Sequence, residues 1–248
     1  MERTPYLFVN TLAHALTSES ASKFSELSSN IWISVGSTHH NQRINHRLVV
    51  NLASNGIRAT VDPQPRVSPR LLGLPNHMEP SVFERQNTEF DRIVEIQFYR
   101  EDNLTRDDTA AVERFLDYYP VPHLSTSSHI PLNSILRAEN LWKREYTTIY
   151  ITGNFLCNQL LDFHLLENPK LEKVLVLGAS HDFMWRIVDS FRNNRKQDQW
   201  SQPPTGKPLQ NLAELGFQRA AIGEMYKELH CQNSVTGRSV TFVGYEGS

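Results

Sequence analysis

The chain has 248 residues, 39% of them hydrophobic and 21% charged, and includes 12 Phe, 8 Tyr and 4 Trp. This composition is too aromatic for a disordered chain and too polar for a membrane protein, so it predicts a globular protein with a sizeable core. The net charge of -2 supplies no bulk attraction for a phosphate backbone or an anionic bilayer, which argues against nucleic acid and membranes as partners.

The cysteines, Cys157 and Cys231, lack metal-type spacing, and residues 1–10 lack the basic and apolar regions of a signal peptide. We therefore expect a protein of a reducing compartment, the cytoplasm or the nucleus, with no metal site and no cofactor. Cys157 falls in the apolar stretch NFLCNQLLDF at 154–163. A thiol in such a stretch behaves as a small hydrophobic side chain, so packing rather than reactivity is predicted.

Residues 5–35 are predicted to form two short helices and the start of a third. Apolar residues recur here three or four apart, which is the spacing of one helix face: Phe8, Leu12, Leu16, Phe24 and Leu27. Pro5 opens the first helix, Ser and Glu residues cap the second, and a Ser-Ser-Asn break precedes Trp32 in the third.

The segment RLVVNLASNGIRATV at 47–61 contains two β-rich runs around Asn55-Gly56, whose residues tolerate positive φ, so a β-hairpin is expected. Residues 62–90 follow. Their prolines remove backbone donors and fix φ, which predicts a linker: Pro63, Pro65, Pro69, Pro75 and Pro80.

From residue 91 a strand is repeatedly followed by a helical stretch. The apolar runs are IVEIQF at 93–98, VPHLSTS at 121–127, TIYITG at 148–153 and KVLVLG at 173–178. Starting points at Ile93, Val121, Ile149 and Val174 give spacings of 28, 28 and 25 residues, within the roughly 20–29 of leucine-rich repeats. The second strand is the weakest, because Pro122 cannot donate to a central ladder.

A last run, SVTFVG at 239–244, follows a segment at 209–229 that is expected to be helical. Strands alternating with helices predict an α/β fold with a mostly parallel sheet. An open, curved solenoid, with stacked strand-helix units like leucine-rich repeats, is preferred to a closed doubly wound domain.

Gly178 lies between a strand and an amphipathic helix, as glycines of nucleotide-binding loops do. A dinucleotide fingerprint needs two further glycines, but Ser180 and Phe183 occupy those positions. The Walker pattern is absent too, because no Gly-Lys-Ser/Thr run follows. Nucleotide binding is therefore disfavoured.

Gly178-Ala-Ser180-His-Asp182 matches the nucleophile elbow Gly-x-Ser-x-Gly at all but its last position. Asp198 and His230 follow in the Ser-Asp-His order of α/β-hydrolases. The preferred interpretation is a strand-to-helix turn in which Ser180 or Asp182 caps the helix. A serine hydrolase using Ser180 is the alternative.

The run STHHNQRINHR places His39, Arg43 and His46 on one face if it is helical, but the roughly 10 Å between the outer histidines is too long for one metal ion. A solvated surface is predicted here, with a small-anion site as the alternative. Core or interface packing is the default for the tryptophans beside amphipathic segments: Trp142, Trp185 and Trp200.

Residues 5–32 resemble a degenerate F-box. In that family a Leu-Pro pair opens a helix ending in Leu, a second helix follows, and a Val-Cys-x-x-Trp segment closes the motif. Here Pro5 and Trp32 have about the family's separation, while Thr4 replaces the usual Leu and residues 28–31 replace the Val-Cys segment. Together with the strand-helix repeats, this plan resembles the divergent nematode F-box-like proteins with leucine-rich-repeat-like C-terminal regions.

The resemblance implies a substrate adaptor of a cullin-type ubiquitin ligase. A head with hairpin (1–61) would dock on a Skp-type adaptor protein, a linker (62–90) would follow, and the repeats (91–248) would bind a target protein. The implied partner-binding residues are the apolar ones of the head: Pro5, Phe8, Leu12, Leu16, Phe24, Leu27 and Trp32. The alternatives are self-packing of these residues in a stand-alone protein-interaction domain, and the hydrolase.

Overall fold

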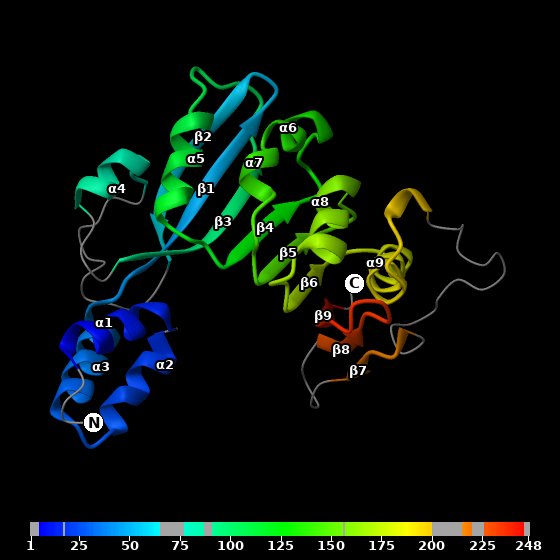
Figure 1. Cartoon of the computed structure of the whole chain (residues 1–248). Coiled ribbons are helices and arrows are strands. Elements are labelled where there is room, and N and C mark those ends of the chain that lie inside the picture. The colour runs from blue at the N-terminus through cyan, green and yellow to red at the C-terminus, as the bar shows by residue number, and fades with distance from the viewer. Residues whose placement is uncertain are drawn as a thin grey trace. The chain divides into compact units, whose positions relative to one another are not determined.

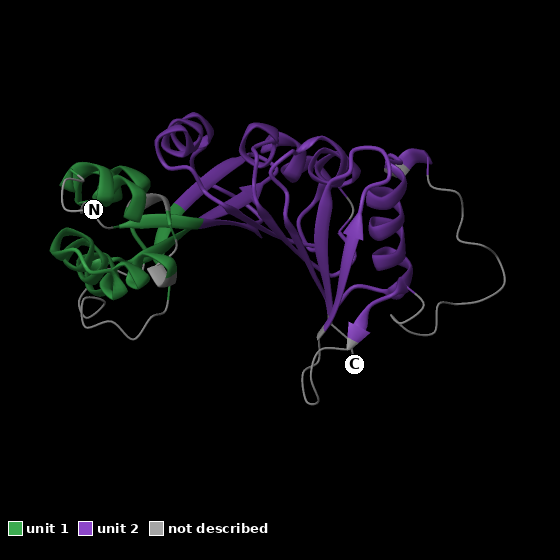
Figure 2. Ribbon diagram, turned by 60° about the horizontal axis from the view of Figure 1, so that its bottom comes forward, with its two compact units in different colours: residues 1–47, 60–94 green, residues 48–59, 95–248 purple. Residues whose placement is uncertain are grey.

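The computed structural model describes residues 5–16, 18–64, 77–86, 91–155, 157–199, 215–219 and 226–245 (Figure 1). The chain divides into two compact units (Figure 2). Unit 1 comprises residues 1–47 and 60–94, and unit 2 comprises residues 48–59 and 95–248. The fold is α/β.

Unit 1 begins with a helical head (residues 5–43). Its helices are α1 (Tyr6–Ala15), α2 (Ser18–Ser22), the 3-10 turn η1 (Lys23–Glu26) and α3 (Asn30–Gln42). The helices predicted over this segment are therefore present. They enclose a small core of apolar side chains: Val9, Ala13, Ala21, Phe24 and Val35.

A glycine lets α3 approach the second helical segment closely. A Cβ atom added to Gly36 would lie 2.7 Å from the Cβ of Phe24 and 2.9 Å from the carbonyl oxygen of Ala21. Neither atom belongs to the free end of a flexible side chain. The absence of a side chain at this position therefore sets the spacing of the head.

Strands β1 (Asn45–Ala53) and β2 (Gly56–Pro63) form the predicted hairpin. The reason given for its turn was wrong, because neither Asn55 nor Gly56 has positive φ. The Asn55 side chain instead donates to the carbonyl oxygen of Leu104 (2.6 Å) and accepts from its N–H (3.1 Å). Gly56 leaves room for Asp107, whose Cβ would lie 3.1 Å from an added Cβ.

Part of the predicted linker is described. Val61 of β2 pairs with Met78 in an isolated bridge, and α4 (Pro80–Gln86) follows with Phe83 buried. Residues 65–76 and 87–90, which include three of the five prolines, lie outside the described residues.

The described strands form one nine-stranded sheet in the order β2-β1-β3-β4-β5-β6-β9-β8-β7. Strands β3 to β6 and β9 are paired in parallel, and β8 and β7 add antiparallel pairs at one end. The remaining strands are β3 (Arg92–Arg100), β4 (His123–Ser127), β5 (Thr148–Thr152), β6 (Lys173–Leu177), β7 (Gln218–Arg219), β8 (Tyr226–Gln232) and β9 (Ser239–Tyr245). The mostly parallel sheet expected from the alternating pattern is thus confirmed.

One predicted helix is partly wrong. Two parts of the segment 209–229 are strands instead: residues 218–219 lie in β7 and residues 226–229 lie in β8. Residues 209–214 and 220–225 of that segment lie outside the described residues. The apolar residues Leu229 and Cys231 alternate with exposed His230 and Gln232, which is the period-2 pattern of a strand.

The helices of unit 2 line one side of the sheet (Figure 2). They are α5 (Thr109–Tyr118), α6 (Leu132–Arg137), α7 (Glu139–Trp142), α8 (Asn158–Asp162) with a π-helical turn (Phe163–Glu167), α9 (His181–Asn193) and the 3-10 turn η4 (Gln197–Gln199). Register partners on five parallel strands are fully buried beneath these helices: Ile96, Leu124, Ile149, Val174 and Phe242. The ring of Phe191 in α9 packs 5.7 Å from that of Phe242.

The strand-helix units follow one another in register. Glu95 pairs with His123, His123 with Thr148 and Thr148 with Lys173, which are steps of 28, 25 and 25 residues. Their turns are also joined. The N–H of Ser128 donates to the carbonyl oxygen of Thr152 (2.9 Å), and the N–H of Gly153 donates to the carbonyl oxygen of Leu177 (2.6 Å). The N–H of Ser180 donates to the side-chain oxygen of Asn154 (2.9 Å).

Pro122 does not interrupt the sheet, although it was expected to weaken its strand. It lies just before β4, and its carbonyl oxygen accepts from Thr147 (2.8 Å) and Thr148 (3.2 Å). The missing N–H falls outside the ladder. Strand β4 is accordingly paired on both sides.

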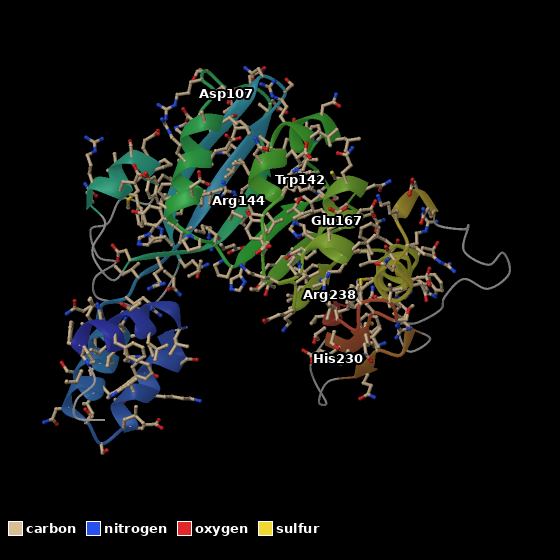
Figure 3. The ribbon with its side chains drawn as sticks, viewed as in Figure 1. Asp107, Trp142, Arg144, Glu167, His230 and Arg238 are labelled. Carbon is tan, nitrogen blue, oxygen red and sulfur yellow. The ribbon has the colours of Figure 1, made fainter. Side chains whose placement is uncertain are left out.

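Arg144 joins two helices of this layer (Figure 3). Its guanidinium contacts the carboxylate of Asp117 in α5 (2.8 Å) and donates to the carbonyl oxygen of Asn140 in α7 (3.1 Å). Trp142 is buried and donates its indole N–H to the carbonyl oxygen of Ile135 (2.9 Å), as predicted for a core tryptophan. Trp185 is half-buried, and Trp200 lies outside the described residues.

Candidate functional site

Helix α1 begins with consecutive large apolar side chains that face solvent. Tyr6 is 53% exposed, Leu7 73% and Phe8 56%. Successive helical residues point about 100° apart, so a helix that packs one stripe against a core cannot bury three in a row. We call Tyr6, Leu7 and Phe8 the α1 surface. An exposed apolar cluster of this kind is typical of a protein-binding site.

The structure divides the apolar head residues implicated by sequence into two groups. Pro5 and Phe8 are exposed at the start of α1. Phe24 is buried in the head's own core, where its ring packs edge-to-face against Trp32 with centroids 4.7 Å apart. The rest of the set is partly buried and packs against that core: Leu12, Leu16, Leu27 and Trp32. Sequence reasoning missed Tyr6 and Leu7, although the run of three apolar residues was visible.

Buried polar groups of α3 hold α1 in place. Arg43, just after α3, donates to the carbonyl oxygens of Ala13 and Leu16 (2.8 Å each) at the carboxyl end of α1. A cation there adds a hydrogen-bond donor for carbonyl groups at the end of the helix and complements the helix dipole. The Nε2 of His39 also forms a 2.8 Å hydrogen bond with the Asn10 side chain. The α1 surface therefore stands on a fixed helix.

The prediction of a solvated surface for the His-Arg run was wrong. His39, Arg43 and His46 are all buried. His46 lies in β1 rather than on the helix, and its ring packs edge-to-face against Phe83 with centroids 5.0 Å apart. No group of residues that could hold a metal ion is found among the described residues.

Within unit 2, the face of the sheet opposite the helices is not covered by any described helix of that unit (Figure 2). Side chains alternate along a strand, so the residues directly before and after each buried strand position point to this side. We call them the open face: Glu95, Gln97, His123, Ser125, Thr148, Tyr150, Lys173, Leu175, Thr241, Val243, Glu228 and His230.

An apolar row forms the centre of the open face, and charged residues lie around it, with Lys173 two residues before Leu175 on the same strand. Tyr150, Leu175 and Val243 are register partners on three neighbouring strands. Glu95 lies towards one end of the sheet and Glu228 towards the other. An apolar centre with a polar rim is the usual anatomy of a protein-protein interface.

Titratable groups at this centre favour their neutral forms. Burial lowers the pKa of His123, whose ring packs edge-to-face against Tyr150 with centroids 6.2 Å apart. Burial, with a smaller contribution from the Glu95 carboxylate, raises the pKa of the Tyr150 hydroxyl. A neutral imidazole beside a neutral phenol suits contact with an apolar partner group.

The turn after β6 behaves as predicted for an architectural turn. Gly178 has φ +64°, as Gly153 has φ +72° one unit earlier, and both values favour glycine. The hydroxyl oxygen of Ser180 caps α9 by accepting from the N–H of Phe183 (3.3 Å). This side chain therefore faces its own helix.

Ser180 and His230 are not brought together. His230 lies opposite Thr241 of β9, and Thr241 lies opposite Lys173 at the start of β6. Ser180 follows the other end of that strand, and four strand residues alone span about 13 Å. His230 instead contacts the Thr241 hydroxyl (3.4 Å) on the open side of β8 (Figure 3). The hydrogen bond that a serine hydrolase needs between these residues is absent from the described structure.

Cys157 is buried at the start of α8, as expected for a thiol that packs. Burial raises the pKa of its thiol, which disfavours the reactive thiolate. Burial likewise raises the pKa of Cys231.

No protein-family model, curated protein or solved structure matches this chain. Within the described parts of the chain, no helix is both long and apolar enough to span a bilayer.

Proposed function

We propose that this protein is a substrate adaptor of a cullin-type ubiquitin ligase, with an F-box-like head that docks on a Skp-type adaptor protein. The observation that carries the proposal is the α1 surface. Tyr6, Leu7 and Phe8 remain exposed although the head has a core of its own. Their exposure favours docking of α1 on a partner, and the F-box resemblance of residues 5–32 supplies the kind of partner.

The second half of the proposal assigns target binding to the open face. Strand-helix units that follow one another at 28, 25 and 25 residues, with helices on one side, support a leucine-rich-repeat-like architecture. In such a stack the uncovered strand face presents many side chains to one partner. The half-buried Tyr150 and Leu175 would form the apolar contact beside the buried Val243, and the surrounding charged residues would orient the target.

The docking half is tested with Leu7→Asp combined with Phe8→Asp. Both side chains are exposed, so the head keeps its fold, while two carboxylates in an apolar contact abolish it. We expect the affinity for a purified Skp-type adaptor, measured by titration calorimetry, to fall by about 100-fold or more. Tyr118→Asp, at a 78% exposed position of α5, is the matched control and should bind as the wild type does.

Two results would contradict docking through α1. One is a wild-type chain that does not bind the adaptor, which would leave a stand-alone protein-interaction domain. The other is equal affinity of the wild type and the Leu7/Phe8 variant. Leu12→Asp with Leu16→Asp is unsuitable for this purpose, because both leucines pack against the head core and the variant should unfold the head.

The target half is tested by comparing two variants in affinity purification with mass spectrometry. The Leu7/Phe8 variant should lose the adaptor and the cullin but retain targets. Tyr150→Asp with Leu175→Asp, on the open face, should lose targets but retain the adaptor and the cullin. Loss of the same proteins from both variants would contradict the division of labour.

A further inference from the structure

A pocket of about 280 Å³ lies at the carboxyl ends of β3, β4 and β5, on the side of the sheet that carries α6. It is lined by residues from the end of β3, from the connection between β4 and α6, and from the connection between β5 and α8. We call it the β3–β5 pocket.

The floor of the pocket is apolar. Ile130, Ile135, Phe155 and Cys157 line it and are all buried. Because burial raises the pKa of the Cys157 thiol, the floor carries no negative charge near neutral pH. Leu132 adds an apolar side chain at the mouth that is 48% exposed. Apolar surface is thus left for a ligand to cover.

The mouth of the pocket favours an anion. Arg100 and His129 line it, and none of its described lining residues is acidic. The guanidinium of Arg100 is paired with Asp102 (2.9 Å), but both side chains are more than half exposed. A surface pair of this kind contributes little stability, so a ligand carboxylate can take Asp102's place. Arginine binds carboxylates through two parallel hydrogen bonds.

We propose that the β3–β5 pocket binds the carboxyl-terminal residue of a target protein, with an aliphatic or aromatic side chain on the floor and the terminal carboxylate on Arg100. A volume of about 280 Å³ holds one large side chain with its carboxylate and is too small for a nucleotide. The exposed mouth lets the rest of the target chain leave towards solvent. The assignment of a protein ligand rests on the proposed function.

The test uses the full chain and a fluorescein-labelled hexapeptide, Gly-Ser-Gly-Ser-Gly-Leu, with a free carboxyl terminus or a terminal amide. Fluorescence anisotropy should show the acid binding at least about tenfold more tightly than the amide, because the amide loses a charge-assisted hydrogen bond. In Arg100→Gln the acid should bind no better than the amide. A peptide ending in Asp should bind as weakly as the amide.

Arg106→Gln is the matched control. Arg106 is also an exposed arginine that pairs with an aspartate two residues later, Asp108, at 2.9 Å, but it does not line the pocket. It should keep the preference for the acid. Equal binding of acid and amide by the wild type, or equal loss in both arginine variants, would overturn the proposal. Binding of N-acetyl-leucine as tightly as the peptide would assign the pocket to a small acid and overturn it as well.

These outcomes are separate from those of the proposed function. The peptide experiment needs no Skp-type adaptor, and the Leu7/Phe8 variant should bind the peptide as the wild type does. If the chain binds the adaptor but not the peptide, only the proposal for the pocket is rejected. If the chain binds the peptide but not the adaptor, only the proposed role in a ubiquitin ligase is rejected.

Discussion

At the scale of single residues, the guanidinium of Arg43 helps to hold α1 in position. It makes two 2.8 Å hydrogen bonds to carbonyl oxygens at the end of that helix from a buried site. Arg43→Met keeps most of the apolar stem and removes both bonds. We expect the free energy of opening of α1 to fall by about 3 kcal/mol, since a hydrogen bond to a charged group contributes about 1.5–3 kcal/mol.

Hydrogen exchange followed by mass spectrometry measures this for the α1 peptide. Arg58→Met, at an exposed arginine of β2, is the control and should leave α1 exchange unchanged. Unchanged exchange in Arg43→Met would mean that the apolar core alone fixes α1. The adaptor affinity should fall with α1 stability, because the α1 surface must be ordered to bind.

Ser180 is a second residue whose role can be separated by substitution. Its hydroxyl caps α9, so Ser180→Ala should lower the free energy of unfolding by about 1 kcal/mol. A fluorophosphonate probe should not label the wild type. Labelling that disappears in Ser180→Ala would establish the hydrolase instead.

At the scale of elements, Gly36 sets the packing of the head. In an unconstrained helix Gly→Ala stabilises by about 1 kcal/mol. Gly36→Ala should have the opposite sign and destabilise the head by about 1–3 kcal/mol, because its new Cβ would lie 2.7 Å from the Cβ of Phe24. Thermal unfolding followed by circular dichroism measures the change, and Ser34→Ala at an exposed position of α3 is the control. Stabilisation in Gly36→Ala would mean that the head repacks freely.

Local patterns predicted the elements whose partners are near in sequence. The three-to-four spacing of apolar residues located α1, and the apolar runs located β3 to β6 and β9. Burial of Arg43 was not predictable, because its acceptors, Ala13 and Leu16, lie 27 to 30 residues earlier in the chain. For the same reason the turn at Asn55 was attributed to positive φ. Its side chain instead bonds to the backbone of Leu104, 49 residues away.

The candidate sites differ in how far the sequence could find them. A run of three apolar residues at the start of a helix predicts exposure of some of them by geometry alone, so Leu7 was within reach. The sequence predicted that a sheet face would be open to a partner but not which residues lie on it, because placing Tyr150 beside Leu175 and Val243 requires the strand order. The β3–β5 pocket was not foreseeable, since it joins the connections after three different strands.

At the scale of the whole molecule, stability should depend on pH through His164. The ring is fully buried, and Asn168 donates its side-chain N–H to Nδ1 (3.2 Å). The Asn168 oxygen accepts from the N–H of Lys170 (3.0 Å), which fixes the amide orientation and makes Nδ1 an acceptor. Burial lowers the pKa of His164 from 6.5 to about 3, although the Trp142 backbone raises it slightly. The folded chain therefore holds a neutral His164.

Because the pKa is lower in the folded chain, the unfolded chain binds the proton first as the pH falls. The contribution of neutral His164 is complete above pH 6.5 and is lost progressively between pH 6.5 and about pH 3. The loss amounts to about 1.4 kcal/mol per pH unit, or about 2 kcal/mol between pH 6.5 and 5. Urea unfolding at pH 7 and pH 5 measures it. His164→Gln should be less stable at pH 7 but lose less on acidification, whereas His129→Gln, at an exposed histidine, should follow the wild type. Equal losses in the wild type and His164→Gln would show that other groups govern the acid response.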